Sequence, residues 1–450
     1  MDNSIYLAGW LIVWLGAILA ALLFRWRGRP AGSGLLLAYL FHLSLIHWVA
    51  TCIYLAQYAY YERAVIEIGF RQSAYAVLAF AFGSVILTPV VLALRRERGP
   101  GAVKYHPHPS LPKAYIIAGM ASYLLSSSVL GRLPSATALV SIGQYLFVIG
   151  VCLSCWQAWL QRSTIRFLGW LLAALLLPFV TILSQGFIGY GTVAATVVFA
   201  FGAGLIRPRW KVVVAGLLMG YLGLSFYVGY MRDRGEIREM VWGGQPVWDR
   251  VERVYRTLRT VEWFDWSDET HLRAIDERLN QNFFVGTAVR RLSTSGDYAY
   301  GETLWQGVMA LVPRVLWPEK PVFAGSPGLV TAYTGIRFAP GTSVGIGQVM
   351  EFYINFGTLG VVLGFLVLGV LITVIDITAG ARLRQGDWQG FALWYLMGIS
   401  FLQVGGSLVE ITSTAAAGVV AAWLVNKGLL LRYQKKQPTL KRQWAPSSIQ

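Results

Sequence analysis

The sequence predicts an all-α polytopic membrane protein with about eleven transmembrane helices, and three observations support this fold class. Of the 450 residues, 56% are hydrophobic and only 13% are charged, against roughly 25% in soluble domains. The apolar residues form uninterrupted blocks of about 20 residues, the length that crosses a hydrocarbon core. Basic residues are concentrated in every second connection between these blocks. A membrane protein is the economical interpretation.

The apolar blocks divide the chain into four regions. Residues 1–230 contain eight predicted spans and residues 231–346 form a large loop. Residues 347–432 contain three further spans, and residues 433–450 form a basic tail. The predicted spans are, in order, 5–24, 32–55, 73–94, 114–131, 137–159, 167–185, 190–206, 212–230, 353–375, 391–410 and 411–431.

The distribution of charge predicts the orientation in the membrane. A formal net charge of +16 would indicate nucleic acid as a partner if the protein were soluble. Here the basic residues follow alternate spans, as in Arg25–Arg29, Arg207–Lys211 and the tail from Arg432 onward. The positive-inside rule then places the N-terminus outside, the C-terminus in the cytoplasm and the large loop on the exported side. The charge therefore indicates a lipid bilayer as partner, and no nucleic acid.

The large loop is rich in arginine and is predicted to be helical. It carries fourteen basic residues, thirteen of them Arg, and an equal number of acidic residues. The planar guanidinium fork suits phosphate and carboxylate groups, whereas the alternative is a solvated helical domain held by ion pairs one turn apart. Hydrophobic periodicity predicts helices outside the bilayer at 247–262 and 268–292, with Arg253 and Asp276 exposed to solvent. A third helix, 303–316, is interrupted by a proline and is expected to lie at the membrane surface.

Short motifs flank these helices. The loop begins with YMRDRG at 230–235, and later segments read LVPRVLWPEKP at 311–321, TGIRFAPGTS at 334–343 and GQVMEFYINFG at 347–357. The pattern resembles that of oligosaccharide repeat-unit polymerases, the Wzy-type O-antigen and exopolysaccharide polymerases. The resemblance covers the topology of the whole chain, while its specific motifs are confined to these segments.

One turn departs from the pattern of that family. Many of its members carry an Arg in the short outer turn that here occupies residues 184–191. This chain reads SQGFIGYG at that turn and has no cation there. A phosphate-contacting role therefore does not transfer to this turn.

The resemblance implies a GT-C-like fold and metal-independent glycosyl transfer at the periplasmic face of the bacterial inner membrane. The implied partners are a polyprenyl-diphosphate-linked oligosaccharide as donor and acceptor, with a chain-length regulator as a further candidate. The leaving group is a lipid diphosphate, whose developing charge preorganised cations would stabilise. The sequence contains no metal-ligand motif or phosphate-binding loop, so we expect no metal and no other cofactor.

The candidate site residues come from these motifs and from the placement of charge. Arg232 and Arg234 lie just outside the eighth predicted span, and Arg337 is flanked by apolar residues, where an unpaired cation is costly. We expect Arg232, Arg314 and Arg337 to converge on a lipid diphosphate, with Glu351 orienting one of them. The predicted catalytic residues are Glu351, Arg314, Arg337 and His271. The predicted substrate-binding residues are Arg232, Arg234, Arg290, Arg291, Lys320 and Ser343.

His271 is the only histidine in the loop, and its position allows two interpretations. It is a candidate general base because imidazole titrates near neutral pH. Its position in the first turn of a predicted helix favours an ordinary surface residue instead.

Two other functions fit part of the same pattern. An O-antigen-ligase-like transferase would use the same topology and cations, because the sequence does not reveal the acceptor. A transporter or flippase of lipid-linked oligosaccharide should show symmetric halves and ionisable residues at midplane. The polar residues of this chain are concentrated in one loop, which favours an enzyme at the membrane surface.

Overall fold

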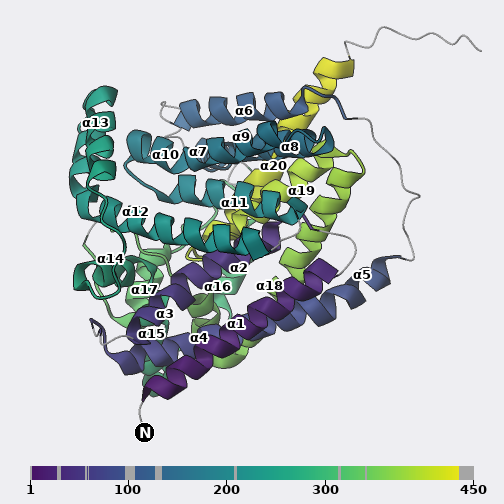
Figure 1. The fold of residues 1–450 in the computed structure, drawn as a ribbon. Coiled ribbons are helices and arrows are strands. Elements are labelled where there is room, and N and C mark those ends of the chain that lie inside the picture. The colour runs from purple at the N-terminus through teal and green to yellow at the C-terminus, as the bar shows by residue number, and fades with distance from the viewer. Residues whose placement is uncertain are drawn as a thin grey trace, which may run out of the picture.

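The computed structural model describes residues 3–27, 32–55, 58, 60–96, 107–126, 134–206, 210–312, 316–339 and 342–434. Within these ranges the regular elements are all helices, which confirms the predicted all-α class. The long helices run in broadly the same direction and form a bundle (Figure 1). We call the end that carries the helices of the large loop the loop end, and the end at which the last helix finishes the tail end.

Nine helical stretches in the described ranges are long and apolar enough to cross a membrane, as expected for a membrane-embedded protein. Large apolar side chains exposed on their outer faces, such as Ile12 and Ile165, are suited to contact with lipid. The stretches are Tyr6–Phe24, Leu35–Leu55, Arg63–Leu94, Leu139–Leu160, Thr164–Gln185, Gly189–Ile206, Val214–Trp242, Gln348–Gln385 and Leu408–Leu429. The helices that form them are α1 (Asn3–Arg27), α2 (Leu35–Ser44), α3 (Ala50–Cys52), α4 (Arg63–Phe82), α5 (Thr88–Arg96), α7 (Pro134–Gly143), α8 (Tyr145–Leu160), α9 (Thr164–Leu175), α10 (Leu177–Gln185), α11 (Gly189–Ile206), α12 (Trp210–Trp242), α18 (Gln348–Arg384) and α20 (Leu408–Gln434).

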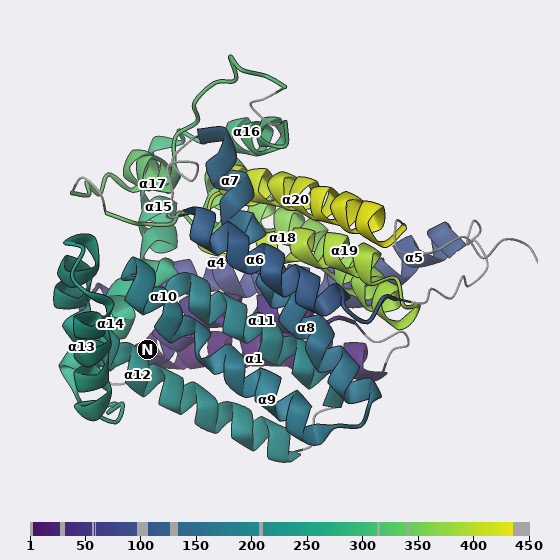
Figure 2. The same cartoon turned by 90° about the horizontal axis from the view of Figure 1, so that it is seen from above.

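Two further predicted spans correspond to shorter helices, α6 (Leu111–Ser126) and α19 (Trp388–Ser400). The predicted block 391–410 is wrong in its second half, because the helix ends at Ser400 and the next begins at Leu408. Helix α6 packs antiparallel to α8, since a Cβ on Gly119 would touch Phe147 and one on Gly150 would touch Pro112. Helix α6 lies beside α8, and α19 lies beside α20 (Figure 2).

The loop starts inside a continuous helix. We predicted that the eighth span ends at residue 230, but α12 continues without a break to Trp242. Its 33 residues extend about 50 Å at 1.5 Å per residue, more than the roughly 30 Å of a hydrocarbon core. The charged last turns of α12 therefore extend beyond the apolar part of the bundle. The other loop helices are α13 (Val247–Arg259), α14 (Glu269–Leu279), α15 (Gln281–Ser295), α16 (Glu302–Ala310) and α17 (Ser326–Thr334).

The predicted helix 268–292 is two helices. Asn280 separates them, and its side-chain oxygen accepts a hydrogen bond from the backbone N–H of Asn282 at 3.2 Å, which caps α15. Helix α16 ends at Ala310, earlier than the predicted 303–316. Helix α17 was not predicted, although Pro327 in its first turn is a typical helix-start signal.

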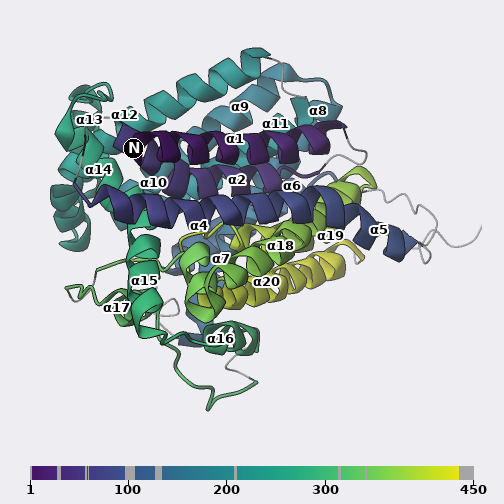
Figure 3. The same cartoon turned by 90° about the horizontal axis from the view of Figure 1, so that it is seen from below.

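Helix α15 packs closely against α4 at the loop end. A Cβ on Gly69 of α4 would overlap the backbone of Asn282, and one on Gly286 of α15 would overlap the backbone of Val65. The two backbones approach closely because both contact positions are glycine. Figure 3 shows α15 lying across the long helices at the loop end. Asp276, which we expected to be exposed, is only 2% exposed.

Candidate functional site

The motif at 347–357 forms the start of α18 and joins several elements. Gln348, Glu351 and Asn355 are fully buried on one face of the helix. Gln348 Oε1 accepts a hydrogen bond from Tyr39 Oη at 2.6 Å, and Glu351 Oε2 accepts one from the backbone N–H of Leu408 at 2.6 Å. Asn355 Oδ1 accepts one at 2.9 Å from the backbone N–H just before α16. The motif therefore holds α2, α16 and α20 together at the loop end.

Glu351 does not orient a described arginine. Its carboxyl group is fully buried at the N-terminus of α20 and accepts a hydrogen bond from the N–H of Leu408. The predicted pairing with Arg232 or Arg337 is absent from the described residues, and Arg314 lies outside them.

Arg232 is neutralised by neighbouring groups of the loop. Its guanidinium contacts Asp233 at 3.0 Å, Thr260 Oγ1 at 2.8 Å and Glu262 at 3.3 Å. Arg253, which we expected on a solvated face, pairs with the carboxylate of Glu236 at 2.8 Å and its side chain is 16% exposed. Helices α12 and α13 are thus fastened by ion pairs, as in the alternative interpretation of the loop.

Two more of the predicted cations are bound by the protein itself. Arg290 forms two hydrogen bonds of 2.5 Å to the carboxylate of Glu62, and these lower the pKa of that carboxyl. Lys320 Nζ donates to the carbonyls of Ala310 and Val312 at 3.2 and 3.0 Å, and so caps the C-terminus of α16. Both contacts account for the cation without a ligand.

Arg291 and Arg337 lie near the end of α17 and are exposed. Arg291 lies against Gly335, where a Cβ would overlap its guanidinium, and Arg337 follows two residues later. Neither side chain has an ion-pair partner in the described part of the chain. Ser343 is exposed beyond them.

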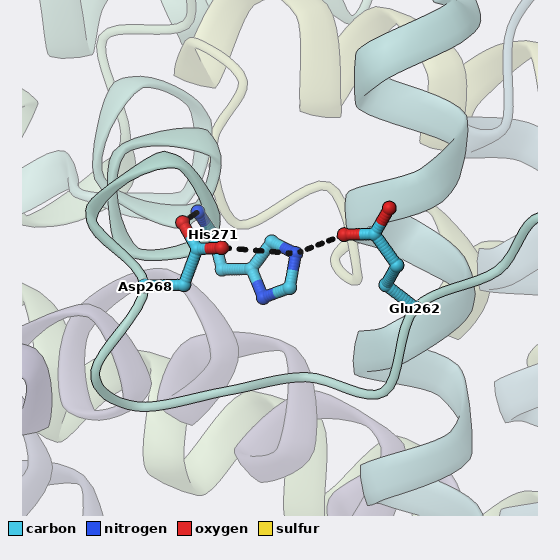
Figure 4. A group of neighbouring side chains, drawn as sticks. All are labelled: Glu262, Asp268 and His271. Carbon is cyan, nitrogen blue, oxygen red and sulfur yellow. Dashed lines mark hydrogen bonds and ion pairs between the residues drawn. The ribbon is translucent and has the colours of Figure 1, made fainter.

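His271 is buried, which contradicts the preferred surface interpretation. Its ring Nδ1 accepts a hydrogen bond from the backbone N–H of Asp265 at 3.2 Å. Its Nε2 lies 3.5 Å from Glu262 Oε2 and 4.0 Å from Asp268 Oδ2 (Figure 4). Hydrogen bonds from Thr270 lower the pKa of Asp268, so this carboxylate is ionised beside the ring.

The spacing of Glu262, Asp268 and His271 would allow a metal ion, but the hydrogen bonds oppose it. A neutral imidazole has one N–H and one lone pair, and the lone pair at Nδ1 already accepts from Asp265. Nε2 then carries the proton and faces two carboxylates, whereas a metal requires a lone pair there. The geometry fits a clamp between α14 and the segment before it.

A different cluster lacks neutralising partners. Tyr227, Tyr230, Arg234 and Arg238 follow one another at three- and four-residue spacing along the last turns of α12, and Arg278 lies in the last turn of α14. The three guanidinium groups all lie within electrostatic range of the Tyr230 hydroxyl. None of them has an ion pair with any described residue. Three mutually repelling cations favour an anion between them.

One member of this arginine cluster (Arg234, Arg238 and Arg278) contacts the turn that lacks a cation of its own. Arg238 Nε donates to the carbonyl of Gly186 at 3.3 Å, and its guanidinium lies 4.3 Å from the centre of the Phe187 ring. Tyr230 Oη donates to the same carbonyl at 2.9 Å. Residues 184–191 contain no cation, but Arg238 of α12 places a guanidinium group beside this turn.

Comparison with known proteins gives one match. A family model described as a domain of unknown function, DUF8712, matches residues 56–425. The chain belongs to the DUF8712 family. No curated protein and no solved structure matches it.

The region matched by the DUF8712 family contains both the motif at 347–357 and the arginine cluster. Of the cluster, we predicted Arg234 but not Arg238 or Arg278. Arg238 follows Arg234 by one helical turn, and this spacing is a signal that could have found it. Arg278 has no such signal, because it reaches the cluster from another helix.

Proposed function

We propose that this protein is a membrane glycosyltransferase that moves a glycan from a polyprenyl diphosphate onto a second lipid-linked repeat unit. The observation that supports it is the arginine cluster, three unneutralised guanidinium groups beside the charged end of a membrane-spanning helix. Guanidinium forks bind phosphate oxygens in pairs, and a lipid diphosphate carries its charge at the membrane surface. Arg234 and its two partners suit such a headgroup.

In this proposal the cluster binds the donor diphosphate and stabilises the leaving group. An acceptor hydroxyl attacks the anomeric carbon, the bond from that carbon to the phosphate oxygen breaks, and the lipid diphosphate leaves with the bonding electrons. The proton of the hydroxyl passes to solvent water. The three cations are in place before negative charge develops, so they lower the barrier without rearrangement. A divalent metal is not required for this role, because the arginines supply the positive charge.

We propose a GT-C-like arrangement of eleven spans, in which α6 and α19 are added to the nine longer ones. The antiparallel packing of α19 against α20 supports this arrangement. Asn426 Nδ2, near the end of α20, donates a hydrogen bond of 3.1 Å to the carbonyl of Gln389 at the start of α19. The loop end then faces the periplasm of a bacterial inner membrane, which agrees with the distribution of basic residues. The arginine cluster lies at that face.

The first prediction tests the cluster. Lys retains the charge of Arg but not the paired donors, so Arg234→Lys and Arg278→Lys should each lower polymer synthesis on the order of a hundredfold. The measurement is gel analysis of polymer and lipid-linked glycans in a deletion strain that expresses each variant at the wild-type level. Single lipid-linked repeats should accumulate.

The matched control is Arg273→Lys, because Arg273 is on the same helix as Arg278 but pairs with Glu277 at 2.7 Å. This variant should make full-length polymer. Normal polymer from Arg234→Ala and Arg278→Ala would refute the assignment. Long unattached chains in the deletion strain would instead indicate an O-antigen-ligase-like transferase, for which the same cluster would serve.

A further inference from the structure

A cavity of about 730 Å³ lies at the loop end between α6, α7, α8, α10, α11 and α20. Figure 2 shows most of these helices grouped on one side of the bundle. Its volume falls within the roughly 300–1,000 Å³ typical of small-molecule sites. The described residues that line it include hydroxyl, amide and phenol side chains, and none of them is charged: examples are Tyr123, Ser141, Gln144, Tyr145, Tyr190 and Gln403.

Two of the lining residues have polar side-chain atoms that are open to the cavity. Gln144 is 6% exposed and Tyr145 is 7% exposed, and neither side chain forms a hydrogen bond with another described residue. Gln144 sits at the junction of α7 and α8, so the interruption of the helix places its amide at the cavity. These groups are arranged to bind a ligand with hydroxyl groups.

The chemistry of the lining favours sugar over a charged or purely apolar ligand. The described lining residues carry amide, hydroxyl and phenol groups. Amide and hydroxyl groups both donate and accept, as sugar hydroxyls do. Tyr145 and Tyr190 pack edge to face, with ring centres 4.7 Å apart, and aromatic rings offer apolar surface to the C–H groups of a sugar.

The cavity adjoins the arginine cluster through one turn. Ser184, Gln185 and Tyr190 line the cavity, while Gly186 and Phe187 of the same turn contact Arg238. Residues two apart in a chain lie within about 7 Å of each other. A headgroup at the cluster and a glycan in the cavity are therefore within reach of one lipid-linked molecule.

We infer that this cavity binds the neutral sugar residues of a lipid-linked oligosaccharide, next to the diphosphate held by the arginine cluster. The inference rests on the proposed function. It assigns the glycan to Gln144, Tyr145 and Tyr190, and the diphosphate to Arg234, Arg238 and Arg278, with the 184–190 turn in contact with both sites.

The test uses full-length purified protein in detergent and two probes. One is the water-soluble oligosaccharide that mild acid releases from the lipid-linked glycans of the producing cells. The other is farnesyl diphosphate, which carries the headgroup without sugar. Gln144→Leu should weaken oligosaccharide binding about tenfold, the effect of one lost hydrogen bond to a buried group, and leave farnesyl diphosphate binding unchanged. Arg234→Ala should do the opposite.

Gln157→Leu is the matched control. Gln157 lies on α8, which begins directly after Gln144, but its side chain donates a hydrogen bond to the carbonyl of Pro109, away from the cavity. It should bind both probes as the wild type does. Equal oligosaccharide binding by wild type and Gln144→Leu overturns the inference. Failure of the wild type to bind the oligosaccharide also overturns it, as does binding of the lipid undecaprenol in the cavity instead of the oligosaccharide. Oligosaccharide binding without farnesyl diphosphate binding supports the cavity but contradicts the proposed function.

Discussion

Asp276 is a buried carboxyl at the contact between α14 and the end of the second membrane stretch. It accepts hydrogen bonds from Tyr54 Oη at 2.6 Å and Asn280 Nδ2 at 2.5 Å. Burial nevertheless raises the pKa of Asp276 from 3.8 to about 6. The native state therefore binds this proton more tightly than the unfolded chain does. The contribution of Asp276 to stability is greatest below about pH 4, declines as the pH rises to about 6 and is constant above it.

Replacing Asp276 with Asn should remove this pH dependence. One pKa unit corresponds to about 1.4 kcal/mol, so a rise from 3.8 to about 6 corresponds to about 3 kcal/mol. Thermal unfolding in detergent from pH 4 to 8 should show the wild type losing stability relative to Asp276→Asn as the pH rises. Parallel curves for the two proteins would show that Asp276 titrates normally.

Single residues also show how far the site could be predicted. Arg234 was predicted because it follows an apolar span. Its two partners were not, because Arg278 meets it only after α14 packs against α12. Arg290 was predicted as a ligand contact, yet Glu62, 228 positions away, neutralises it. Whether a cation is free depends on such distant partners, which local sequence does not reveal.

At the scale of helices, the crossing of α4 and α15 depends on two glycines. A Cβ on Gly286 would overlap the carbonyl oxygen of Val65, which is backbone and has no rotamer to change. Gly286→Ala should therefore push the helices apart and destabilise the protein by about 1–3 kcal/mol. The measurement is the detergent-solubilised melting temperature of each variant.

Gly235→Ala serves as the control for that prediction. Gly235 lies inside α12 with no atom within 4 Å of a built Cβ, so Ala should be neutral or stabilising there. If Gly286→Ala melts at the same temperature as Gly235→Ala, the close crossing is not present in solution.

Helices differ in how well the sequence predicts them. Nine of the predicted spans coincide with helical stretches long and apolar enough to cross a membrane, because length and hydropathy are local properties of a segment. The packing of α15 against α4 was not predicted, because its mixed apolar and polar sequence is also typical of a surface helix. Its burial depends on contact with Gly69 of α4, and on Asn282 donating to the carbonyl of His47 at 2.8 Å.

At the scale of the whole molecule, the two ends of the bundle have different chemistry. The loop end carries the arginine cluster, the cavity lined by Gln144 and Tyr145, and the buried contacts of the 347–357 motif. The described tail end includes Arg382, which pairs with Asp387 at 2.8 Å. An enzyme that acts on a lipid-linked glycan from one side of a membrane requires such asymmetry, whereas a transporter places its site near midplane.

The difference between the two ends predicts that the loop end lies outside the cytoplasm and the tail end inside it. In a protein whose native Cys52, Cys152 and Cys155 are replaced by Ala, Gln245→Cys at the loop end should react with a membrane-impermeant maleimide in intact cells. Gln385→Cys, exposed between α18 and α19, should react only after permeabilisation, because α18 separates the two positions. The physical reason is that basic residues flanking spans are retained in the cytoplasm. The opposite pattern would place the arginine cluster and the cavity in the cytoplasm, where a glycan already exported on its lipid carrier could not reach them.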